Sequence, residues 1–231
     1  MLLISIIPSI ILFYVVWKGD RYEKEPPKLL IKLFLLGALT TVSAMIIETV
    51  GEDYIFAFMD QQSMLFILID NFFIVALSEE AGKYIVLKKA TWKHPAFNYT
   101  FDGVVYAVAA SLGFATLENV LYVFSNGFGV AIIRALFSVP GHVIDALYMG
   151  YYYGLAKHAE AYGNMDLRKK YLRYAFFVPV LIHGFYDFCL STEYGLFIFI
   201  FLVFEIVITI LAIKKFRTLS RIAATIPETD A

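Results

Sequence analysis

Long apolar runs separated by short polar connections dominate this chain. Seven such runs can be recognised, and most reach the roughly 20 residues that a helix needs to cross the hydrocarbon core of a membrane. The first run lacks the basic leader and small-residue cleavage site of a signal peptide, so we expect it to be a retained span. The runs cover residues 2–17, 29–50, 64–87, 101–125, 128–156, 171–190 and 194–213. This pattern predicts an all-α polytopic membrane protein, a bundle of about seven transmembrane helices.

Basic residues are confined almost entirely to every second connection. Of the 19 lysines and arginines, 17 fall within residues 18–32, 88–93, 157–173 and 214–221, and the alternate connections contain none. Because cytoplasmic loops carry the excess of Lys and Arg, we expect the N-terminus outside and the C-terminus in the cytoplasm. The chain is then a single membrane-embedded domain over residues 1–231 with a short cytoplasmic tail at 214–231.

Composition agrees with this class and narrows the partners. The 231 residues are 60% hydrophobic and 17% charged, with a mean hydropathy of +0.72, against about 45–50% apolar and about 25% charged in soluble domains. A net charge of −1 gives no indication of a nucleic-acid partner. The single cysteine, Cys189, excludes an intramolecular disulfide and is expected to be a buried, inert thiol. The lipid bilayer is the expected environment of the chain, and its sequence does not indicate an oligomeric state.

Ionisable residues inside the predicted spans are the candidates for function. Each costs about 2.5–3.5 kcal/mol at the centre of an inserted helix, so each is a functional hypothesis unless it is paired or faces a cavity. These residues are Glu79, Glu80, Lys83, Glu118, Arg134, His142, Asp145, His183, Asp187 and Glu205.

Helical spacing relates several of these residues to one another. Lys83 lies four positions after Glu79 and three after Glu80, so its ammonium can reach either carboxylate. His183 and Asp187 are also four positions apart, which places Asp187 where it can orient the imidazole. The sequence therefore predicts two polar groups on two different helices.

Prolines and depth bear on whether these groups can meet. Pro140 and Pro179 precede His142 and His183, and a proline inside a span kinks the helix where protein or water can satisfy the freed carbonyl. At 1.5 Å per residue, Glu79 and His142 lie about 21–22 Å from the outer ends of their spans, whereas His183 lies only about 10 Å from its own. His183 would need a tilt, a kink or a water-filled recess to join the others.

These residue types suit a hydrolase that activates water with a carboxylate. A buried glutamate, Glu79 or Glu80, is placed to remove a proton from water. His183 and His142 would hold that water, protonate the leaving amide nitrogen or stabilise an oxyanion.

The same residues are also compatible with roles other than this one. There is no H-E-x-x-H or G-x-S-x-G motif. A metal site made of Glu79, Glu80, His142 and His183 is an alternative, but these residues have no short metal-ligand spacing, so we expect no metal or cofactor. These side chains would also serve as structural ion pairs, and Glu118 with Asn119 as hydrogen-bonding contacts between helices. A proton-coupled carrier or a non-catalytic signalling scaffold is the alternative class.

The motifs together resemble the PrsW family of bacterial membrane proteases, which is distantly related to the CAAX-processing and bacteriocin-processing endopeptidases. The resemblance covers about residues 20–190. It rests on the segments DRYEKEPPKLLIKLFLLGAL, SEEAGK, FDGVVYAVAASLGFATLENVLY, GHVIDALYMGYYYGLAK and IHGFYDF.

The resemblance implies a glutamate-dependent protease of the bacterial cytoplasmic membrane. Its substrate would be a membrane-spanning anti-sigma factor, or another single-span protein, cut first on the outer side to activate an extracytoplasmic-function sigma factor. The family's essential carboxylates match Glu79 and Glu80 and its late-span histidine matches His183, with His142 as a weaker match. Lys83, Glu118, Asn119 and Asp187 are expected to support them.

Overall fold

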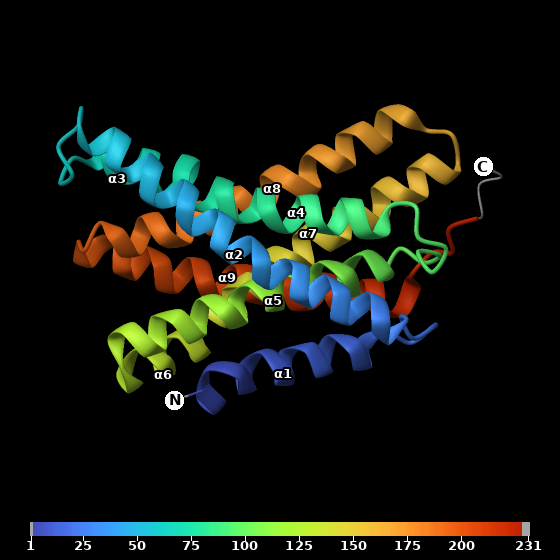
Figure 1. Cartoon of the computed structure of the whole chain (residues 1–231). Helices are drawn as coiled ribbons and strands as arrows, with labels where there is room; N and C mark the ends of the chain where they lie inside the picture. The colour runs from blue at the N-terminus through green and yellow to red at the C-terminus, as the bar shows by residue number, and fades with distance from the viewer. Residues whose placement is uncertain (1, 228–231) are drawn as a thin grey trace.

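The fold is an all-helical bundle in which the long helices run roughly along one direction (Figure 1). The computed structural model describes residues 2–227. Its elements in chain order are α1 (Leu2–Gly19), α2 (Pro27–Phe56), α3 (Met64–Ile69), the π-helical segment η1 (Asp70–Val75), α4 (Ala76–Thr91), α5 (Asp102–Asn126), α6 (Phe128–Leu136), α7 (Ser138–Ala161), α8 (Met165–Ser191) and α9 (Gly195–Ile222).

Each predicted span corresponds to one helical segment or to two or three segments in close succession. In the described part of the chain, six helical stretches are long and apolar enough to cross a membrane, one of them being α6 and α7 together. The remaining predicted span is α3, η1 and α4 in direct succession, in which the π turn divides the helix into shorter pieces. The prediction of about seven helices in a multi-pass membrane protein is therefore confirmed. The last helix is longer than predicted, since α9 continues to Ile222 through much of the expected tail, whose residues 228–231 lie outside the described part.

The connections alternate between the two ends of the bundle. The four groups of basic residues lie where α1, α4, α7 and α9 end and where α2, α5 and α8 begin, and we call this the basic end. The α2–α3, α5–α6 and α8–α9 connections lie at the opposite end. The start of α1 and the end of α9 also lie at opposite ends of the bundle in Figure 1.

Local signals in the sequence explain several boundaries. Pro27 opens α2, where its missing N–H costs nothing, and the Ser63 hydroxyl caps α3 by accepting from the backbone N–H of Phe66 at 3.1 Å. Gly127 has a φ of +86° and separates α5 from α6. The break between α6 and α7 falls at Phe137, three residues before Pro140, because a proline ring clashes with the carbonyl one turn earlier.

Helix α5 is the centre of the bundle and packs against α1, α2, α4 and α7. Glycines allow the closest approaches. A methyl group on Gly113 would lie 1.9 Å from the carbonyl oxygen of Phe34 in α2, and one on Gly154 would lie 2.1 Å from that of Thr100. Small residues at such crossings permit backbone contact between membrane helices. The Gly150–Gly154 face of α7 is thus a close-packing surface against the start of α5.

The Glu-Pro segment before α2 is fixed to the bundle core at the basic end. Glu25 is 2% exposed and accepts a hydrogen bond from the Tyr106 hydroxyl on α5. After α9 the chain returns to the α4–α5 connection, where the Thr100 backbone N–H donates to the carbonyl of Ala224 at 2.9 Å. Contacts between distant segments therefore order the connections at this end.

Candidate active site

Five ionisable side chains from α4, α7 and α8 meet in the interior of the bundle. Lys83 Nζ lies 3.2 Å from Glu79 Oε2 and 2.7 Å from Glu80 Oε1, so both contacts predicted from helical spacing are present. The same ammonium lies 3.1 Å from His142 Nδ1 on α7. His183 on α8 completes the cluster, with Nδ1 2.9 Å from Glu80 Oε1. All five side chains are buried, and none is more than 7% exposed.

His183 lies between carboxylates on both of its ring nitrogens. Nδ1 faces Glu80, and Nε2 lies 3.0 Å from Asp187 Oδ2, one turn further along α8. Glu79 Oε2 and Asp145 Oδ2 lie further away, each 3.8 Å from a ring nitrogen. A ring with an acceptor at each nitrogen is suited to the imidazolium form, in which both nitrogens donate.

His142 has the complementary arrangement. A lysine ammonium only donates hydrogen bonds, so Nδ1 of His142 accepts from Lys83, and Nε2 carries the proton. Nε2 then donates to Glu118 Oε2 at 2.9 Å. The same oxygen of Glu118 lies 2.6 Å from an Arg134 nitrogen. This order of donors fixes one neutral tautomer of His142 and distinguishes it chemically from His183.

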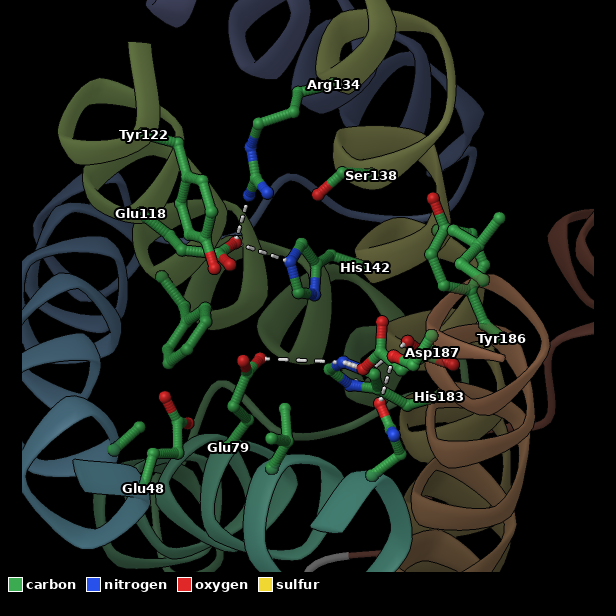
Figure 2. A pocket seen from close by; sticks show the side chains of 18 of the residues that line it. Glu48, Glu79, Glu118, Tyr122, Arg134, Ser138, His142, His183, Tyr186 and Asp187 are labelled. Carbon is green, nitrogen blue, oxygen red and sulfur yellow. Dashed lines mark hydrogen bonds and ion pairs between the residues drawn. The ribbon is translucent and has the colours of Figure 1, made fainter. Parts of the chain in front are cut away.

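Three members of the cluster, Glu79, His142 and His183, form the inner wall of a cavity of about 670 Å³ (Figure 2). The cavity extends to residues at the end opposite the basic end, among them Glu52 on α2, Asn126 at the last position of α5 and Ser191 at that of α8. Of the residues assigned to the site from the sequence, those that line the cavity are Glu79, Glu118, His142, His183 and Asp187.

The remaining predicted residues lie behind or beside this wall. Glu80 and Lys83 are 0% and 1% exposed and do not line the cavity. Asn119 is fully buried and connects helices, since its amide donates to the Ser5 carbonyl of α1 at 2.9 Å and its oxygen accepts from Arg134 at 3.3 Å. Its contacts in the structure are therefore of the interhelical kind.

The depth problem posed by His183 is resolved by the unequal lengths of the helices. The Ser191 hydroxyl, at the last position of α8, donates to Asn71 Oδ1 at 3.0 Å. Helix α3 thus extends past the end of α8, and distances counted from the ends of the two spans have different origins. Eight or nine residues inward from this contact, His183 and Glu80 reach the same level.

Further charged residues line the cavity that sequence reasoning left out of the predicted site. Glu48 was not considered at all, whereas Asp145 and Arg134 were recognised only as ionisable residues within predicted spans. Glu48 on α2 accepts a hydrogen bond from the Ser78 hydroxyl at 3.1 Å. Asp145 is 4% exposed and its Oδ1 has no hydrogen-bond partner in the described structure. Arg134 forms an ion pair with Glu118. Glu48 lies within a predicted span, so the criterion used for the others would have found it.

Four side chains of the cluster are of the types that bind metal ions. Glu79, Glu80, His142 and His183 each offer one ligand atom, and these atoms lie within 4.8 Å of one another. A zinc ion would lie about 2.0–2.2 Å from such nitrogen and oxygen ligands. However, Lys83 Nζ already lies within 3.2 Å of three of the four residues. The donor types suit an ion, but the chain's own cation takes the place between them, so the residues as arranged do not fit a metal.

Comparisons with known proteins agree with this architecture. A family model described as PrsW family intramembrane metalloprotease matches residues 25–213. The chain is 36% identical to Protease PrsW of Clostridioides difficile (strain 630) over 210 residues, 89% of this chain and 85% of the relative. It is 35% identical to Protease PrsW of Oceanobacillus iheyensis over 213 residues, 92% of this chain and 93% of the relative. No solved structure matches.

A third relative, Protease PrsW of Bacillus subtilis (strain 168), is 34% identical over 191 residues, 81% of each chain. The matched region contains every side chain of the buried cluster and nearly all of the helices around the cavity. By the extent of these matches, the chain belongs to the PrsW family of intramembrane proteases.

Proposed function

We propose that this chain cleaves a membrane-spanning anti-sigma factor at its outer side, using water activated by Glu79. The observation that carries the proposal is the division of labour between neighbouring carboxylates. Glu79 lines the cavity, whereas Glu80 is completely buried and contacts both Lys83 and His183. Glu79 is therefore the carboxylate available to water, and Glu80 positions the two cationic groups.

The chemical step follows from this arrangement. Glu79 accepts a proton as the water oxygen attacks the peptide carbonyl carbon, and a tetrahedral oxyanion forms. When the C–N bond breaks, the proton held by Glu79 moves to the leaving nitrogen. The hydroxyl of the water is then part of the new carboxylic acid, and its proton is on the new amine.

The two histidines have different tasks in this scheme. The His183 imidazolium lies at the cavity wall and supplies positive charge to the oxyanion, while Glu80 and Asp187 hold its orientation. Neutral His142 uses both ring nitrogens to contact Lys83 and Glu118, so it connects these two charged side chains and fixes their positions at the same wall. Such preorganised dipoles stabilise developing charge without reorganising at the moment of reaction.

The location of the cavity supports the side of the cut. It extends to the end of the bundle opposite the basic loops, and basic loops favour the cytoplasm. An outer-side cut in the bacterial cytoplasmic membrane agrees with this orientation. Family membership implies a membrane-protein substrate, and the anti-sigma factor is the substrate suggested by the motifs. The whole chain, residues 1–231, would form one protease domain with its motifs in residues 20–190.

A cleavage assay with purified, reconstituted protein tests the proposal. A panel of single-span anti-sigma factors is offered to wild type, Glu79→Gln, Glu80→Gln and His183→Ala, and the melting temperature of each variant is measured. We expect wild-type cleavage that is lost in variants that remain folded. Mass spectrometry of the products locates the cut relative to the span.

Persistent cleavage by folded Glu79→Gln protein would contradict the assignment of the base. A cut on the cytoplasmic side would contradict the orientation. Proton flux across the vesicles without cleavage of any panel member would favour the carrier class instead.

A further inference from the structure

A second cavity lies at the basic end, between the ends of the first and last helices. Its volume is about 330 Å³, and four of its lining side chains are basic. Two come from the end of α1 and the loop that follows it, and two come from the last two turns of α9. The lining residues are Val15, Lys18, Gly19, Arg21, Phe216, Arg217, Ser220 and Arg221.

Specific contacts bring these distant segments together. The buried Ser220 hydroxyl donates to the carbonyl of Gly19, and the Tyr22 hydroxyl donates to the carbonyl of Arg221 at 2.6 Å. The Phe216 ring lies against Gly19, where an added methyl group would be 2.3 Å from its Cζ atom. The convergence of the basic side chains is thus built into the packing of α1 on α9.

The four basic side chains of this cavity form no ion pair with the described acidic residues. Neither Lys18 nor the three arginines has a carboxylate oxygen within 4.0 Å among residues 2–227. Other cations at the same end do have one, since Lys157 and Arg168 both pair with Glu160 at 3.3 and 2.9 Å. Four like charges around one cavity repel one another unless an anion lies among them.

The surface next to the cavity is apolar and faces outward. One and two turns deeper along α1, Val15 and Ile11 are 51% and 56% exposed. At the matching depth on α9, Ile213 and Ile210 are 43% and 48% exposed. A ligand in the cavity therefore meets cations at the level of the basic loops and aliphatic side chains toward the membrane interior.

We propose that this cavity binds a phosphate group, and that the phosphate is the headgroup of an anionic phospholipid whose acyl chains lie on α1 and α9. The arginines supply forked donors that match phosphate oxygens, and basic residues at the cytoplasmic surface attract anionic lipids. The site shares no lining residue with the cavity of the proposed protease centre. Binding there does not depend on the proposed reaction.

A binding measurement on the full chain in neutral detergent tests the proposal. Short-chain phosphatidylglycerol, short-chain phosphatidylcholine and inorganic phosphate are titrated separately, with the thermal shift and native mass spectrometry as readouts. The test variant is Arg217→Gln/Arg221→Gln. The matched control is Lys169→Gln/Arg173→Gln, which removes two exposed charges from α8 at the same end of the bundle. Neither variant touches the proposed protease centre.

We expect wild type to bind phosphatidylglycerol at least about tenfold more tightly than phosphatidylcholine, which corresponds to about 1.4 kcal/mol. The test variant should lose this preference and the control should keep it. If the test variant does not fold, Arg21→Gln, in the loop after α1, replaces it. Equal losses in test and control variants would overturn the proposal, because they would indicate bulk charge. Binding of inorganic phosphate as tight as that of the lipid would keep the phosphate site and overturn the lipid as its source.

Discussion

Helices α5 and α9 are both long and apolar, yet the bundle uses them in opposite ways. In the most apolar 18-residue window of each helix, 72% of the residues of α5 are buried but only 11% of those of α9. Helix α5 is covered by neighbours and contributes Glu118 to the charged network around the active-site cavity. Helix α9 leaves most of its side chains to the lipid and carries its arginines at one end.

The difference shows where charge can be kept in a membrane protein of this size. In the centre, each charged group of the cluster is held by a partner on the same or a neighbouring helix, as Lys83 is by Glu79 and Glu80. At the periphery, Arg217 and Arg221 lie at the level of the basic loops, where water and headgroups replace protein partners. Substitutions in the centre should therefore have much larger consequences than similar ones at the periphery.

The sharpest test of this contrast is Glu79→Gln. Loss of a positioned general base should lower the cleavage rate by about 10²–10⁴-fold, while the fold is retained. Glu205→Gln is the matched control, because Glu205 lines the same cavity from α9 and no partner is found for it among the described residues. Rates of peptide release from a reconstituted substrate measure both. Equal losses in the two variants would contradict a specific role for Glu79.

Removing the central cation should have the next largest effect. Lys83→Met leaves two buried carboxylates without their common partner, and breaking a buried ion pair costs about 3–5 kcal/mol. Lys88→Met changes an exposed lysine one helical turn or so further along α4 and should be nearly neutral. Unfolding in detergent, followed by circular dichroism, compares them. If Lys83→Met were as stable as Lys88→Met, the cluster would not depend on its ammonium.

A smaller loss of stability is expected where only packing changes. Gly113→Ala forces a methyl group against the Phe34 carbonyl of α2, and overpacking of this kind costs about 1–3 kcal/mol. Gly129→Ala on α6 meets no atom within 4 Å and offers the same change in open space. Melting temperatures of the two proteins give the comparison. A stable Gly113→Ala variant would mean that α2 and α5 separate easily.

The smallest effect should come from removing metal ions. Because Lys83 lies among the donor atoms, cleavage by wild type should be unchanged after incubation with a chelator, and elemental analysis should find no stoichiometric zinc. Loss of activity that added zinc restores would contradict this expectation. It would mean that Lys83 moves aside to admit an ion, as the metalloprotease description of the family implies.

Hydropathy predicts the helices of this protein well because membrane-spanning backbone must satisfy its own hydrogen bonds. All seven predicted spans have helical counterparts, with boundaries that differ mainly where a helix continues into a loop. The contacts within α4 were also predictable, since Glu79, Glu80 and Lys83 share one face by spacing alone. Their functional roles stay predictions.

Contacts between residues on different helices could be predicted less well from the sequence. The ion pair of His183 with Glu80 depends on how far α3 extends beyond α8, which no periodicity encodes. Likewise, Lys83 reaches His142 only because α4 and α7 lie at one depth. The two histidines were selected as ionisable residues within predicted spans and by the motif resemblance, whereas spacing and depth left open whether they meet the glutamates.

The π-helical segment η1 lies directly before α4, and the N–H of Ala76 bonds to the carbonyl of Asn71, five residues back. A π turn accommodates one residue more than an α turn, and such segments are frequent at functional sites. Deleting one residue here, such as the exposed Phe73, would let a regular helix form and rotate α3 by about 100° relative to Glu79. The number of residues in this single turn therefore sets how α3 is rotated about the helix axis relative to Glu79 and Glu80. Insertions and deletions should be tolerated far less here than in the loops.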